Sequence, residues 1–256
     1  MNLHVEITGS GRPLVLIHGL FGSSTNLRGV ARIFSDRYQV FNLDLPNHGR
    51  SPHTSSMTYQ DMSAALSAFA TDAGIENAVW LGHSMGGKAL MDLMLRVPES
   101  RDLAVVVDIA PVSYDHSYQE YVQAMLELDP AALTSRGTAD KLLRRVVTDK
   151  ATRLFLLQNL IPAERGYRWR INLPVLQQHL PDIKGFPDHR STFKGPALFV
   201  AGQNSNYITD THRPRIRELF PQAKFAEVAA AGHWVHADQP QALVDVVYAF
   251  VESSDV

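Results

Sequence analysis

The sequence contains no cysteine, no long apolar run and no excess of basic residues. The lack of cysteine excludes disulfides, thiolate metal sites and a cysteine nucleophile. No run approaches the ~18 consecutive apolar residues that favour a membrane-spanning helix. Lys and Arg number 24 against 26 Asp and Glu, which argues against a basic domain built for nucleic acid.

The first nine residues also lack a basic stretch followed by an apolar one, so we expect no secretory signal and a cytoplasmic protein. With 256 residues, of which 45% are hydrophobic and 20% are charged, the composition is typical of a folded protein of one or two domains. A chain of this length buries roughly 70–75% of its unfolded surface, so it needs no metal or disulfide for stability.

Short apolar runs alternate with helix-like stretches along most of the chain. Nearly continuous apolar strands are typical of a sheet that is buried on both faces. The alternation therefore predicts an α/β fold, with a mostly parallel sheet and helices on both faces. Strands are predicted at residues 13–19, 38–45, 78–84, 103–110 and 196–202, with weaker ones at 3–8 and 224–230. Helices are predicted at residues 26–35, 59–73, 85–95, 211–220 and 240–253.

Residues 112–194 break this alternation, because they contain no strong strand pattern. Roughly 80 residues are too many for a loop between two strands. We expect a helical lid over the carboxyl edge of the sheet, inserted into an α/β core formed by residues 1–111 and 195–256. Its helices are predicted at residues 118–127, 131–147, 151–159 and 173–180.

The strongest chemical motif is Gly-His-Ser-Met-Gly-Gly at residues 82–87. It has the form G-x-S-x-G and stands directly between a predicted strand and a predicted helix, which is the setting of a nucleophile turn. A helix N-terminus also favours negative charge that develops nearby. The motif predicts Ser84 as a nucleophile, and the alternative is an ordinary glycine-rich turn.

Acyl transfer also needs amide donors for an oxyanion. The turn at residues 18–22, His-Gly-Leu-Phe-Gly, follows an early strand and can aim such donors at the space above Ser84. We expect the N–H groups of Leu20 and Met85 to serve, with Phe21 as the alternative to Leu20. A purely steric role for these glycines is the simpler interpretation.

A base is expected late in the chain, because hydrolases of this type order their triad as nucleophile, acid and histidine. His233 follows the last predicted strand and precedes the last helix. His236 is the alternative, whereas His83 and His48 are expected to have structural roles.

The chain resembles the α/β-hydrolases through the motifs at residues 18–22, 44–51, 82–87 and 232–233, which span nearly all of it. Asn-His-Gly at residues 47–49 and the sequences at 82–88, 107–112, 169–172 and 231–236 resemble, more narrowly, the bacterial YbfF-type esterases and their mitochondrial relatives. The resemblance implies a cofactor-free serine hydrolase with a helical lid. Its substrates would be small-molecule carboxylic esters or acyl thioesters, acyl-CoA among them.

The acid of the triad is less clear, because the position usual for it after the strand at 196–202 holds Ser205. The candidates are Asp108, Asp210 and Asp238, and the last is very close in sequence to His233. Asp108 ends an apolar strand, where a carboxylate needs a partner. Pairing with His233 would supply one, and the resemblance favours the same assignment. Ser205 would then be a hydrogen-bond partner of this pair.

Other residues are candidates for structure or for substrate contact. Asp44 is expected to fix its own turn, and Phe21 and Trp234 are expected to contact substrate. Aromatic residues of the predicted lid suggest an acyl pocket, although core packing explains them equally well. They are Tyr114, Tyr118, Tyr121, Phe155, Tyr167 and Trp169. Arg168, Arg170 and Lys88 are candidates for contact with an anionic head group.

Several rival functions share this fold. A serine at position 84 argues against epoxide hydrolases and haloalkane dehalogenases, which use an Asp nucleophile. C–C hydrolases, lyases and cofactor-free haloperoxidases keep the same triad and stay open. The serine in the usual acid position also leaves open a non-catalytic binding scaffold.

Overall fold

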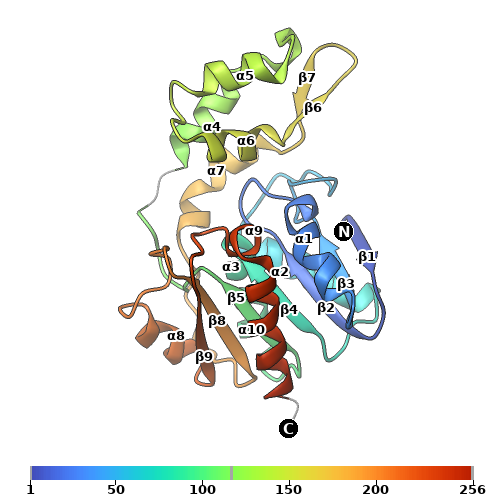
Figure 1. The fold of residues 1–256 in the computed structure, drawn as a ribbon, viewed down its shortest axis with the longest axis vertical. Helices are drawn as coiled ribbons and strands as arrows, with labels where there is room; N and C mark the ends of the chain where they lie inside the picture. Colours follow the sequence, from blue (N-terminus) through green and yellow to red (C-terminus); the bar gives the residue numbers. More distant parts are fainter. Residues whose placement is uncertain (1, 116–117, 255–256) are drawn as a thin grey trace.

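The structure is a computed structural model that describes residues 2–115 and 118–254. Its centre is a seven-stranded sheet in the order β1-β3-β2-β4-β5-β8-β9 (Figure 1). Neighbouring strands are parallel except for the antiparallel pair β1 and β3, so the predicted fold class is confirmed. The strands are β1 (Val5–Thr8), β2 (Arg12–Ile17), β3 (Tyr38–Leu43), β4 (Val79–His83), β5 (Leu103–Val107), β8 (Ala197–Gly202) and β9 (Ala223–Val228).

Helices cover both faces of this sheet. Helices α1 and α10 bury their apolar sides on one face, and α2, α3 and α8 bury theirs on the other (Figure 1). One further helical turn, α9, follows β9. The helices are α1 (Ser24–Phe34), α2 (Tyr59–Asp72), α3 (Met85–Arg96), α8 (Arg213–Leu219), α9 (Val235–Asp238) and α10 (Pro240–Glu252).

The central strands are buried because they are almost wholly apolar; every residue of β4 and β5 is buried. Successive side chains point to opposite faces. Val105 therefore packs in the same cluster as Phe34 and Val247, and Val106 in the cluster with Leu66 and Leu90. Since β2, β4, β5 and β8 are parallel, their carboxyl ends meet at one edge. The loops that leave this edge are brought together there.

Residues 112–194, called the inserted segment from here on, follow β5 and precede β8. Figure 1 shows them beyond the carboxyl edge of the sheet. The resemblance predicts the lid between strands six and seven of its fold. These are β5 and β8, the fifth and sixth strands of this sheet in chain order. Residues 1 and 255–256 of the predicted core, and 116–117 of the predicted lid, lie outside the described residues. The helices of the segment are α4 (Gln119–Leu126), α5 (Arg136–Leu143), α6 (Lys150–Leu157) and α7 (Leu173–Lys184).

Two expectations for this segment were wrong. The single helix predicted at 131–147 is a short 3-10 helix, Pro130–Ala132, followed by α5, because the Ser135 hydroxyl caps a new helix by accepting from the Thr138 amide. The segment also contains a strand pair, β6 (Leu160–Pro162) and β7 (Tyr167–Trp169). Three-residue strands are too short to show a periodic pattern.

Candidate active site

Ser84 occupies the sharp turn between β4 and α3. Its φ and ψ are 53° and −121°, in a region that non-glycine residues rarely adopt. The turn is held because the Ser84 amide donates to the carbonyl of Val107, 3.0 Å away. A Cβ on Gly82 would lie 2.4 Å from the Gly86 carbonyl oxygen, so the flanking glycine is required sterically. The strain presents the hydroxyl at the carboxyl edge of the sheet.

His233 and Asp108 lie in line with this hydroxyl. His233 Nε2 is 3.1 Å from Ser84 Oγ, and His233 Nδ1 is 2.7 Å from Asp108 Oδ2. A carboxylate accepts and does not donate, so Nδ1 carries the ring proton and Nε2 accepts from the serine hydroxyl. The structure therefore brings together all three residues that the sequence predicted for a triad.

Asp108 is fully buried at the end of β5 and also has a positive φ of 53°. Its carboxylate accepts from the Gly202 amide at 3.1 Å and from the Ser205 hydroxyl, in addition to His233. Both donors come from β8 and the loop after it, because β5 and β8 are adjacent in the sheet. Ser205 thus holds the carboxylate that arrives from the neighbouring strand.

The two other acid candidates lie elsewhere. Asp210 has a side chain that is 90% exposed and forms an ion pair with Arg213 at 3.2 Å. Asp238 accepts from the amide of Gly232 at 2.8 Å, which closes the turn that carries His233. Neither carboxylate contacts the imidazole of His233 among the described residues.

Leu20 and Met85, the residues expected to supply the oxyanion donors, lie near Ser84. Among the described residues, neither amide donates a hydrogen bond, and both residues line the same small cavity as Ser84. The Phe21 amide, by contrast, donates to His48 Nε2 at 3.2 Å. This bond removes the alternative that Phe21 supplies the donor, and it gives His48 a structural role in the turn.

The histidines near the site are held neutral. Burial lowers the pKa of His48 to about 3 and that of His236 to about 4, and it lowers the pKa of His83 well below its ordinary value. His83 Nε2 donates to the carbonyl of His233 at 2.8 Å and so positions the backbone of that residue. His236 packs against His83 with 4.6 Å between ring centroids. The hydrogen bond to the Ser84 hydroxyl is made by His233 and not by His236.

Asp44 stabilises the turn at residues 44–50 through hydrogen bonds to backbone amides, as expected. Its carboxylate accepts from the amides of Ser24 and, at 2.8 Å, of Arg50, and it lies against Gly49. A Cβ on Gly49 would overlap this carboxylate, and the φ of Gly49 is +56°. Glycine is therefore required at the last position of the Asn-His-Gly sequence.

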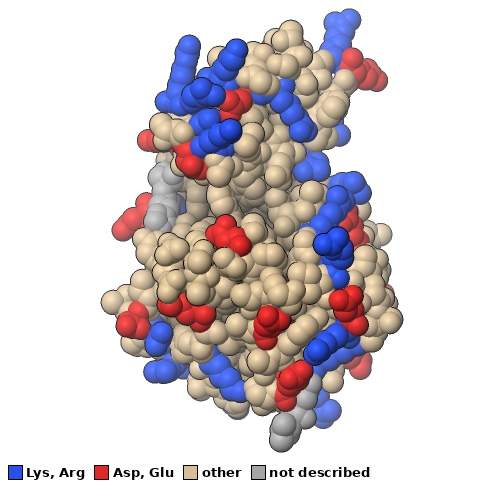
Figure 2. Space-filling model, viewed as in Figure 1, with Lys and Arg blue, Asp and Glu red and all other residues tan. Residues whose placement is uncertain are grey.

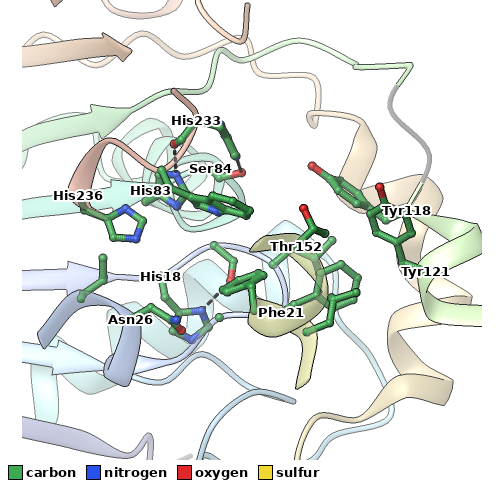
Figure 3. Close-up of a pocket in the computed structure, with 17 residues that line it drawn as sticks. His18, Phe21, Asn26, His83, Ser84, Tyr118, Tyr121, Thr152, His233 and His236 are labelled. Carbon is green, nitrogen blue, oxygen red and sulfur yellow. Dashed lines mark hydrogen bonds between the residues drawn. The ribbon is translucent and has the colours of Figure 1, made fainter. Parts of the chain in front are cut away.

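A cavity of about 200 Å³ opens on Ser84 and His233. In Figure 3 Tyr118, Tyr121 and Thr152 of the inserted segment face the histidines of the core across it. Of the six aromatic residues noted in the sequence, Tyr118, Tyr121 and Phe155 line this cavity. Tyr114 lines a smaller cavity that also includes Ser84, whereas Tyr167 and Trp169 lie on β7 and line neither cavity. Phe21 and Trp234, the expected substrate contacts, also line the larger cavity.

The sequence did not reveal the role of Tyr207. Its ring stacks on the imidazole of His233, with 3.9 Å between centroids and 21° between planes. Its hydroxyl lies 2.8 Å from that of Tyr118, which belongs to the inserted segment. Its position two residues after Ser205, in the loop of the usual acid, was the only available signal.

Lys88 is not available for an anionic head group, so that expectation was wrong. The side chain is buried, and its ammonium donates to the carbonyls of Val112, Lys184 and Gly185 at 2.6–2.9 Å. Burial also lowers its pKa to about 7. Lys88 thus ties α3 to both ends of the inserted segment.

The family model described as alpha/beta hydrolase fold matches residues 12–240. The chain belongs to the α/β-hydrolase fold family. Among the curated relatives of this α/β-hydrolase, sn-1-specific diacylglycerol lipase ABHD11 of Mus musculus is 41% identical over 246 residues, which cover 93% of this chain and 80% of that protein.

Esterase YbfF of Escherichia coli (strain K12) is 36% identical over 236 residues, which cover 92% of this chain and 91% of the relative. A solved structure titled "Marine microorganism esterase" matches with a TM-score of 0.93 and 36% identity, over 97% of this chain and 99% of that one. The resemblance to YbfF-type esterases that the motifs predicted is thereby confirmed.

Proposed function

We propose that this α/β-hydrolase cleaves carboxylic esters through an acyl-enzyme on Ser84. The observation that carries the proposal is the hydrogen-bonded line Ser84–His233–Asp108 at the wall of an apolar cavity. Relatives named as esterase and lipase support the same reaction class. Acyl thioesters, including acyl-CoA, are the second substrate class that we propose, and a cytoplasmic location stays a prediction.

In the first half of the proposed reaction, Ser84 Oγ attacks the acyl carbon while its proton moves to His233 Nε2. Negative charge then develops on the carbonyl oxygen, and the amides of Leu20 and Met85 donate to it. Asp108 holds the imidazole in position and offsets its positive charge. His233 next gives its proton to the departing alkoxide or thiolate, and the acyl group stays on Ser84.

In the second half, water attacks the acyl-enzyme. His233 Nε2 accepts a proton from this water as the new C–O bond forms, and it returns a proton to Ser84 Oγ as the ester bond to the enzyme breaks. The products are a carboxylic acid and the free serine. None of these steps uses an oxidant or a reductant.

The two cavities at Ser84 suggest how a substrate is held. We assign the acyl chain to the larger one, because Phe21, Phe155 and Trp234 give it an apolar lining. We assign the other side of the scissile bond to the smaller cavity, which shares Ser84 with the larger one and is also lined by Met85 and Tyr114. The inserted segment supplies one wall of each cavity. We therefore propose that residues 112–194 act as a lid on a core of residues 1–111 and 195–256.

A non-catalytic scaffold was suggested by the serine at position 205. The serine no longer supports a scaffold, because Asp108 at the end of β5 pairs with His233. The Ser205 hydroxyl donates to Asp108. No described feature favours a C–C hydrolase, a lyase or a haloperoxidase over an esterase.

The test is release of p-nitrophenol from p-nitrophenyl butyrate by the wild type and by Ser84→Ala at equal concentration. We expect turnover by the wild type and none by the variant. Reaction with a fluorophosphonate should also label the wild type alone. Equal turnover by both proteins, or a folded wild type that neither turns over nor is labelled, would falsify the proposal.

A further inference from the structure

Positive charge is concentrated in one part of the chain. Residues 136–170 contain nine Lys and Arg against three Asp and Glu, although the whole chain has a net charge of −2. In Figure 2 blue side chains gather at the end of the molecule where Figure 1 places α5 and the β6–β7 pair. This end is formed by the inserted segment and lies far from the C-terminus.

Exposed apolar side chains occur in the same region. Among the described residues, five large hydrophobic side chains are exposed, and three of them fall within 142–154. Leu142 and Val146 are each 40% exposed, and Leu154 is 51% exposed. A basic residue directly precedes each of the first two, because Lys141 and Arg145 are their neighbours in sequence.

Three of the basic side chains of this region have no ion-pair partner among the described residues. Among the described residues, Lys141, Arg145 and Lys150 form no ion pair. Asp140 is already occupied by Arg144 and Arg153, at 3.0 and 2.8 Å. The charge of the three free cations is therefore directed to solvent or to an external partner.

This exposed surface backs onto the catalytic cavity. Thr152, Phe155 and Leu156 on α6 line the cavity beside Ser84. Leu154 lies two positions from both Thr152 and Leu156, so it points to the other side of the helix, and it is exposed. The helix thus separates the cavity from an outer surface with apolar and basic side chains.

We propose that this outer surface docks on an anionic lipid bilayer. The basic–apolar surface comprises Lys141, Leu142, Arg145, Val146, Lys150 and Leu154. Cationic side chains are attracted to anionic head groups, and apolar side chains beside them enter the interface. An acidic protein is the alternative occupant, and failure to bind anionic vesicles would favour it over the bilayer.

Docking in this position holds the lid against the lipid, so the substrate class would be a lipid ester drawn from the bilayer. That part of the inference rests on the proposed function, whereas the docking itself does not use Ser84. The contact lies on the surface, because no helix among the described residues has the length and apolarity to cross a membrane.

The test is co-sedimentation of the whole chain with vesicles of phosphatidylcholine, with and without phosphatidylglycerol. We expect binding to the phosphatidylglycerol vesicles that weakens as salt is raised. Lys141→Gln/Arg145→Gln should lower this affinity roughly thirtyfold, since each of the two cations contributes about 1 kcal/mol near an anionic surface and about 1.4 kcal/mol corresponds to a factor of ten. Leu142→Ser/Val146→Ser should lower it as well.

Matched controls come from the core. Arg32→Gln/Arg101→Gln removes two exposed cations, and Val97→Ser removes a side chain that is 41% exposed. We expect wild-type binding from both variants. Equal binding to neutral and anionic vesicles, binding to neither, or an equal loss in these controls would overturn the proposal.

Two activity measurements separate this inference from the proposed function. The surface variants should hydrolyse soluble p-nitrophenyl butyrate like the wild type, but should be slower on an ester embedded in anionic vesicles. Ser84→Ala should bind vesicles normally. If Ser84→Ala keeps its turnover but binds, the proposed function fails and the docking stands. If the surface variants lose no vesicle binding, the docking fails and the proposed function stands.

Discussion

The two walls of the catalytic cavity are built in different ways. The core wall presents Ser84 and His233, and Asp108 is buried behind His233. Ser84 and Asp108 both lie in strained turns with a φ of 53°, and hydrogen bonds join the three side chains. The wall from the inserted segment presents Tyr121 and Phe155, which face the cavity and are held mainly by packing. Backbone geometry therefore fixes the chemistry, and side-chain packing shapes the space for substrate.

This difference predicts large losses of rate from substitutions in the core wall. Substitutions in the wall from the inserted segment should cause only small changes of substrate preference.

Asp108→Asn should give the largest effect, a fall in kcat of about 10⁴-fold, because an amide cannot offset the charge of the imidazolium or hold the same tautomer. Steady-state kinetics with p-nitrophenyl butyrate measures it. Asp210→Asn is the matched control and should keep wild-type activity; a comparable loss there would assign the acid to Asp210.

Tyr207→Leu should lower kcat up to about tenfold with little change in KM, because the stacked ring that positions His233 is lost. Tyr207→Phe retains the ring and loses only the hydroxyl, so it should restore most of kcat. If Leu and Phe variants are equally slow, the stacking does not position the histidine.

Ser205→Ala should cost less, about threefold in kcat, because Asp108 keeps the Gly202 amide as a second donor. Ser205→Thr retains a hydroxyl and is the control. Unchanged rates in Ser205→Ala would count against a role for this hydroxyl in holding the acid.

On the other wall, Phe155→Ala should raise KM roughly threefold for p-nitrophenyl esters of longer acids and leave the acetate ester almost unaffected, since only apolar contact is lost. Tyr167→Ala, on β7 and outside the cavity, is the matched control. A large fall in kcat for the acetate ester would mean that the two walls are not separable in this way.

Acid should lower the free energy of unfolding through two buried histidines of the core. The pKa values of His48 and His236, about 3 and 4 in the folded chain, lie below the ordinary 6.5, so the unfolded chain binds more protons between these limits. Stability is therefore complete above pH 6.5 and falls as the pH drops toward 4, by about 1.4 kcal/mol per pH unit for each histidine. Urea unfolding between pH 7 and 5 measures this slope. It should be shallower in His236→Gln, and an identical slope would show that His236 is not held neutral.

The sequence predicted the parts of the molecule whose causes are local. Apolar runs identified five strands of the sheet, and the two edge strands β1 and β9 were weaker candidates. A serine between glycines after such a run identified the strained turn. Asp108 could be proposed because a carboxylate in an apolar strand is costly without a partner. The usual acid position, occupied by Ser205, pointed in the same direction.

Features that depend on distant segments were missed. The stacking of Tyr207 on His233 joins two loops that only the sheet order brings together. Lys88 stayed a candidate for contact with an anion, because nothing local shows that three carbonyls of the inserted segment surround its ammonium. Two local features were missed for another reason. The strands β6 and β7 have three residues each, too few to show a periodic pattern, and the capping Ser135 lies within a stretch that otherwise has helical character.

The enclosure of Lys88 has a practical consequence. Only 1% of this residue is exposed, and each N–H of its ammonium is engaged by a carbonyl from one end of the inserted segment or the other. An amine-reactive reagent can reach it only while those ends are parted from α3. The rate at which Lys88 acquires a label, followed by peptide mass spectrometry, would therefore report how often the inserted segment separates from α3. The measurement needs no substitution in the chain.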